Sequence, residues 1–117
     1  MTVEHVLAVV PVADLARARD WYVRLFGRAP DNQPMETLDE WRVTGTGWVQ
    51  VHVDPDRAGR GLLNLAVDDV DAHVRDLRER GVAAGEVQVV TKGVQLCPLQ
   101  DPDGNVVTLL GGFRTTY

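Results

Sequence analysis

The chain has 117 residues, of which 44% are hydrophobic and 25% are charged, and its formal net charge is -5. This composition predicts a soluble globular domain with one core, because disordered chains contain fewer apolar residues. The arginines are interspersed with acidic residues, so the chain lacks the basic face that nucleic-acid binding needs. No apolar run approaches the roughly 20 residues of a membrane span. With one cysteine and no apolar leader, we expect a cytoplasmic location.

The first half predicts a strand, a helix and three further strands. Residues 3–10 are rich in Val and Leu, which is typical of a buried strand. Asp14 is expected to cap a helix that ends at Gly27. The remaining elements of this half are a loop at 28–34, a short strand at 35–38, a turn at Asp39–Glu40, and strands at 41–44 and 48–53.

The second half repeats this order. After a Pro/Gly-rich linker at 54–61, Asp69 is expected to cap a second helix that ends at Gly81. Asp14 and Asp69 lie about 55 residues apart, so the sequence predicts a duplicated module. The strands of this half are expected at 62–67, 86–90, 94–100 and 105–110, with a hairpin loop at 101–104.

The predicted architecture is one α+β domain, residues 1–117, made of two βαβββ modules. Module one covers about 3–53 and module two about 62–113. Each half-sheet is too small to be stable alone, and pairing the halves creates a shared cleft in which function would lie.

Several motifs together resemble the vicinal oxygen chelate superfamily, which includes glyoxalases, extradiol dioxygenases and bleomycin resistance proteins. They are the segment 11–15 (PVADL), the helical residues 21–22 (WY) and 25–27 (LFG), and the turn 101–105 (DPDGN) before the last apolar strand. The resemblance covers about 3–113. It implies that the paired modules form a cupped mixed sheet with helices on the outer face, and that the protein is a homodimer.

The resemblance also locates the family's metal-ligand positions. They fall near the start of each module and on the last strand of each module, at Leu7, Gln50, Leu62 and Thr108. Divalent cations bind carboxylate oxygens or imidazole nitrogens, which this set lacks. The sequence therefore predicts no metal and no cofactor, and it argues against metal-dependent glyoxalase or dioxygenase activity.

Two histidines keep an enzymatic alternative open. Strand alternation puts His5 on the face of Leu7 and His52 on the face of Gln50, so two imidazoles could point into one cup as a shifted metal site. Either one could also act as the general base of a lyase, isomerase or dioxygenase-type enzyme of the same superfamily. They are weak candidates, because no acidic residue on the last strand completes a ligand set.

One face of the strand at 48–53 is predicted to line a small-molecule pocket. Val49, Val51 and Val53 share one face, which leaves Trp48, Gln50 and His52 together on the other. An indole beside two hydrogen-bonding groups is typical of a small-molecule site. The predicted ligand-binding residues are Leu7, Trp41, Trp48, Gln50, His52, Leu62, Asn64 and Thr108, with Trp41 at the mouth of the cup.

These observations favour a metal-free small-molecule-binding protein of the bleomycin-resistance type that sequesters an aromatic or antibiotic-like organic ligand. A purely structural or regulatory dimer is a further alternative. Cys97 has two interpretations. If 101–104 is a four-residue loop, Cys97 lies opposite Thr108 on the cleft face; a packed, inert cysteine is favoured over a cavity thiol, because the sequence places no base beside it.

Overall fold

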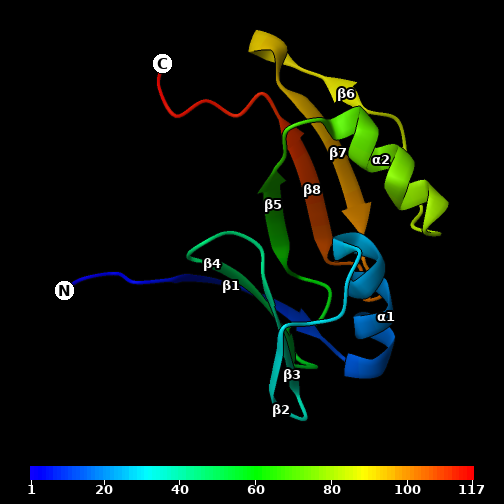
Figure 1. Ribbon diagram of the computed structural model, residues 1–117. Coiled ribbons are helices and arrows are strands. Elements are labelled where there is room, and N and C mark those ends of the chain that lie inside the picture. Colours follow the sequence, from blue (N-terminus) through cyan, green and yellow to red (C-terminus); the bar gives the residue numbers. More distant parts are fainter.

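The computed structural model describes residues 1–117 and contains two four-stranded mixed sheets with one helix each (Figure 1). The first module consists of β1 (Val6–Val12), α1 (Leu15–Phe26), β2 (Asn32–Met35), β3 (Leu38–Arg42) and β4 (Gly47–Val53). The second consists of β5 (Leu62–Ala66), α2 (Val70–Glu79), β6 (Gln88–Val89), a short 3-10 helix (Thr91–Gly93), β7 (Gln95–Gln100) and β8 (Val106–Gly111). The predicted α+β fold of paired βαβββ modules is confirmed.

The two sheets share one topology. The strand orders are β1-β4-β3-β2 and β5-β8-β7-β6. In each sheet the first and last strands of the module pair in parallel, and the other pairs are antiparallel. β1 and β5 are therefore the end strands of their sheets, and each leaves one edge without a strand partner.

The helices begin and end where the sequence predicts. The side chains of Asp14 and Asp69 accept hydrogen bonds from the backbone amides of Arg17 and Ala72, which caps α1 and α2. Gly27 ends α1 in the left-handed region, with a φ of 71°. Neither helix is long and apolar enough to cross a membrane.

The turn predicted at Asp39–Glu40 is wrong. Both residues lie inside β3, where they pair with Val51 and Gln50, and the turn falls three residues earlier, at residues 36–37 between Met35 and Leu38. The cause is a long-range ion pair: Arg19 on α1 donates two hydrogen bonds to Asp39, which holds this acidic residue in the sheet. β2 also starts earlier than predicted, and Pro34 is tolerated there because β2 is an edge strand. β6 is shorter than the predicted strand 86–90.

One continuous core lies beneath both helices. It includes Val10, Tyr22 and Trp41 of the first module and Leu77 and Val107 of the second. A core shared in this way means that neither module buries its apolar residues alone.

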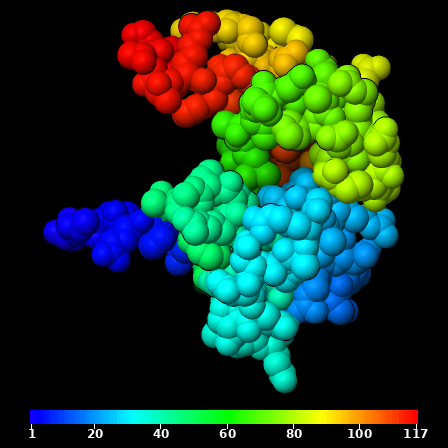
Figure 2. Space-filling view, viewed as in Figure 1, coloured from blue at the N-terminus to red at the C-terminus, as the bar shows by residue number.

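Polar groups join the two modules at several points. The side chain of Asn105 donates to the carbonyl of Pro11 at 2.7 Å and accepts from the amide of Gly61 at 2.7 Å. The guanidinium of Arg80, at the end of α2, donates to the carbonyls of Arg24 and Leu25 at the end of α1. From the Pro11 join, β1 and β5 diverge, and the molecule is hollowed between the two modules (Figure 2).

Candidate functional site

The strand register defines the open face of the first sheet, which is the face opposite α1. Leu7, Val9 and Pro11 of β1 pair with Trp48, Gln50 and His52 of β4, and β3 continues the row on the other side. Directly paired residues share a face. The open face therefore consists of Leu7, Val9, Pro11, Leu38, Glu40, Arg42, Trp48, Gln50 and His52 on these three strands.

Two apolar side chains of β1 on the open face are highly exposed, whereas Leu38 of β3 on the same face is buried. Leu7 and Val9 are 50% and 56% exposed, whereas Val10 and Val12 on the other face of β1 are buried. Trp48, Gln50 and His52 are half-buried beside them. An exposed aliphatic surface next to an indole is typical of a ligand or protein contact surface.

Glu40 is a polar residue of this face that the sequence analysis missed. Its Oε2 accepts a 2.6 Å hydrogen bond from Gln50 Nε2, and its Oε1 accepts a 3.4 Å bond from Asn32 Nδ2. The incorrect turn at Asp39–Glu40 hid this residue. In the strand Leu38–Arg42, successive side chains alternate between the face under α1 and the open face. This alternation places Glu40 on the open face beside Gln50.

The second sheet has a similar open face, opposite α2. Asn64 of β5 pairs with Thr108 of β8, so these two predicted residues lie side by side. Leu62 is 84% exposed at the start of β5. The structure thus places the predicted residues in two groups, one on the open face of each sheet.

A groove of about 490 Å³ lies in the hollow between the modules. Val6, Ala8 and Val49 of the first sheet line it together with Leu63 and Leu65 of the second. Trp48 and Asn64 are the predicted site residues in its lining. These aliphatic residues belong to the faces that carry the helices, since Ala8 pairs with the buried Val49 and Leu65 pairs with the buried Leu109. The groove therefore lies on the helix side of both sheets, and Trp48 and Asn64 are the members of the two groups that contribute to its lining.

Trp41 is not at the mouth of the cup, and its predicted position is wrong. Its side chain is 0% exposed, and its Nε1 donates to the carbonyl of Arg28 at 3.0 Å. The ring lies 6.1 Å from that of Tyr22 and 5.5 Å from that of Phe26. Trp41 pairs with Val49, so it shares the face under α1 rather than the open face.

Cys97 lies in the core rather than on the cleft face. The final hairpin pairs Gln100 with Val106, one residue later than expected, so Pro98 is opposite Thr108 and Cys97 is opposite Leu109. The sulfur is fully buried, and this burial raises the pKa of the thiol. The favoured interpretation of a packed thiol agrees with this environment.

His5 and His52 do not face one another. Val6, next to His5, bonds to Thr46 before the start of β4, whereas His52 pairs with Pro11 near its end. Along the strands, the position of His5 is six residues from that of His52, which corresponds to about 20 Å. The shifted metal site that would use both imidazoles is therefore wrong.

The third histidine, His73, lies on α2 away from these strands. Its Nε2 contacts Oδ1 of Asp68 at 2.8 Å at the start of the helix.

The family model of the Glyoxalase/Bleomycin resistance protein/Dioxygenase superfamily matches residues 2–109. With this match and the fold above, the chain belongs to that superfamily. No curated protein matches it.

Solved structures of similar proteins have the same fold. A glyoxalase/bleomycin resistance protein from Catenulispora acidiphila is 31% identical, with a TM-score of 0.86, over 92% of this chain and 96% of that one. An antibiotic binding protein from a Streptomyces species is also 31% identical, with a TM-score of 0.75, over 95% and 98% of the two chains. A lactoylglutathione lyase from Agrobacterium tumefaciens shares the fold at 18% identity and a TM-score of 0.74, over 92% of each chain.

The residues at the family's metal-ligand positions do not fit a metal. The side chains of Leu7 and Leu62 offer no donor atom, and Gln50 offers only a neutral amide oxygen. Thr108 contributes at most a neutral hydroxyl. Nowhere in the chain do three or more His, Cys, Asp or Glu side chains gather closely enough to hold an ion.

Proposed function

We propose that this protein binds a planar organic ligand on the open face of its first sheet and sequesters it without a metal or cofactor. The observation that carries the proposal is the row Trp48, Gln50 and His52, half-buried beside the exposed aliphatic side chains of Leu7 and Val9. An indole offers a stacking surface, and the amide and imidazole offer hydrogen bonds that fix a ligand's orientation. The similarity to an antibiotic binding protein supports this class of ligand.

We further propose that the protein acts as a homodimer. Leu7, Val9 and Leu62 expose apolar surface, and β1 and β5 each have one unpaired edge. Both features favour contact with another chain. A second copy that covers these faces would enclose the ligand and add Asn64 and Thr108 of the second sheet to the site.

A binding titration tests the proposal. Planar three-ring compounds should quench tryptophan fluorescence and raise the melting temperature, since a ligand that binds only the folded state stabilises it. Trp48→Ala should abolish both responses, while Trp21→Phe on α1 should keep them. If none of these compounds binds, the proposal fails. Conversion of a bound compound that is lost in His52→Ala would instead favour an enzyme.

A further inference from the structure

Two adjacent carboxylates of β3 have opposite electrostatic surroundings. Asp39 is fully buried on the α1 side and is neutralised by Arg19, whose Nε and Nη2 donate at 2.6 and 2.9 Å. Glu40 points to the open face and has no cation within ion-pair distance. Its hydrogen-bond partners are the neutral amides of Gln50 and Asn32. Glu40 is therefore held in place by neutral groups and forms no ion pair.

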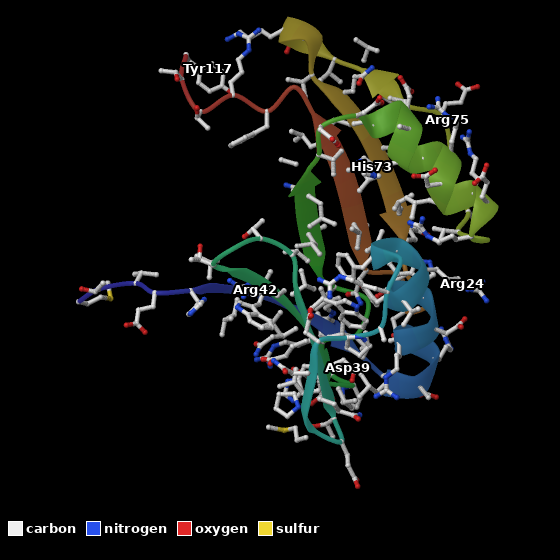
Figure 3. All side chains as sticks on the ribbon, viewed as in Figure 1. Arg24, Asp39, Arg42, His73, Arg75 and Tyr117 are labelled. Carbon is white, nitrogen blue, oxygen red and sulfur yellow. The ribbon has the colours of Figure 1, made fainter.

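The other carboxylate near this surface, that of Asp54 just beyond β4, lies close to His52 and is paired with Arg57. On the paired strands, Glu40 is the one acidic residue of the first open face, and the open face of the second sheet carries no charged residue. The cation nearest along β3 is Arg42, whose guanidinium donates to the carbonyl of Gly45 at 2.7 Å in the β3–β4 turn (Figure 3). Arg42 pairs directly with Trp48, so a ligand on the open face encounters the carboxylate of Glu40 beside Gln50 and a guanidinium that is already engaged by the turn.

From this arrangement we propose that Glu40 is a specificity-determining residue that selects ligands carrying a protonated amine or amidinium beside a flat ring. The inference rests on the proposed function, because it concerns the same site. Each carboxylate oxygen has a second lone pair after accepting from an amide, so a charged N–H can still bind. A charge-assisted bond at a half-buried site is stronger than one between neutral groups. The net charge of -5 attracts cations as well.

The spacing along the strands suits such a ligand. Glu40 pairs directly with Gln50, and Trp48 is two residues from Gln50 on the same face. Two residues that are two positions apart on one strand lie roughly 7 Å apart. A ring stacked on Trp48 can therefore place an amino substituent at the carboxylate of Glu40.

Three probes of similar shape and different charge test the proposal: proflavine, which is cationic, acridone, which is neutral, and acridone carboxylate, which is anionic. Calorimetric titrations compare the wild type, Glu40→Gln and the control Glu36→Gln, which removes the same charge from the exposed β2–β3 turn. We expect Glu40→Gln to weaken proflavine binding about tenfold and acridone binding by less than about twofold. Glu36→Gln should leave both affinities nearly unchanged.

The outcomes separate the two proposals. If the wild type binds acridone carboxylate as tightly as proflavine, the inference about Glu40 is overturned, while binding on the open face stands. Equal loss of proflavine affinity in both variants also overturns it, because the effect would then be long-range. If the wild type binds none of the probes, the proposed function fails and this inference fails with it. The wild-type comparison needs no variant to fold.

Discussion

The phenol of Tyr22 donates a 2.8 Å hydrogen bond to Oδ2 of Asp101, which lies 79 residues away in the second module. Asp101 also accepts from the side chain of Asn105 and from the backbone amides of Asp103 and Asn105. Asn105 in turn bonds to Pro11. Every fully buried side-chain polar atom in the protein has a partner. The network thus connects α1, β1 and the final hairpin inside the core.

Tyr22→Phe should destabilise the protein by about 1–2 kcal/mol, because it deprives a buried carboxylate of a hydrogen bond without changing the volume of the ring. Urea denaturation followed by circular dichroism measures the effect. Tyr117→Phe is the matched control, because this side chain is exposed at the C-terminus. Equal stability of the wild type and Tyr22→Phe would contradict the role of this bond.

Stability should also fall at alkaline pH. Burial, and then the negative charge and hydrogen bond of Asp101, raise the pKa of Tyr22 far above its ordinary value of 10.0. The folded state keeps the phenolic proton while the unfolded state loses it, so this contribution to stability is complete below about pH 10 and falls as the pH rises further. The loss between pH 9 and pH 11, on the order of 1 kcal/mol for this one residue, should be smaller in Tyr22→Phe. Parallel pH profiles of wild type and variant would refute this.

The two faces of β4 should respond differently to truncation. Val51 is fully buried under α1, so Val51→Ala should cost about 1–3 kcal/mol of unfolding free energy. Trp48→Ala, on the open face, should cost less and should remove ligand binding. Thermal melts with and without proflavine measure both quantities. The reverse pattern would mean that the faces have exchanged roles.

Arg19→Met should destabilise the protein by about 3 kcal/mol, because it leaves the buried carboxylate of Asp39 without its cation. Arg24→Met is a matched control on the same helix. Its partner, Asp20, is largely exposed, so the loss should stay below about 1 kcal/mol. Chemical denaturation of both variants gives the comparison, and similar losses would show that the burial of Asp39 does not matter.

Light scattering at micromolar concentration should give about twice the chain mass of 12.9 kDa. Leu62→Glu should shift the protein toward the monomer, because it places a charge on a highly exposed apolar position at the start of an unpaired strand edge. Arg75→Glu, on the exposed side of α2, serves as the charge-changing control. A wild type that is monomeric at every concentration would rule out the dimer.

Local signals explain how much of the fold the sequence predicts. The caps Asp14 and Asp69 and the terminal glycines act within one helical turn, so the two helices and the duplication are visible in the sequence. The alternation in β4 is equally local, and it placed Trp48, Gln50 and His52 on one face correctly.

Errors arose where distant partners decide the local structure. The turn-like pair Asp39–Glu40 becomes a strand because Arg19, 20 residues away, neutralises Asp39. Because of that error, Glu40 was not predicted as a site residue, and the face of the sheet on which Trp41 lies could not be predicted. The hairpin register differs because Oδ1 of Asp101 accepts from the amide of Asn105, which draws Asn105 into the loop.

The bond from Arg80 to the last turn of α1 makes each module part of the other's structure. Carbonyls at the end of a helix need partners, and those of Arg24 and Leu25 find them in a side chain of the opposite half. An isolated first half would lose this cap together with the shared core. We therefore expect a single cooperative unfolding transition, with equal calorimetric and van't Hoff enthalpies. We also expect that neither half folds alone, even though each carries the pattern of a complete module.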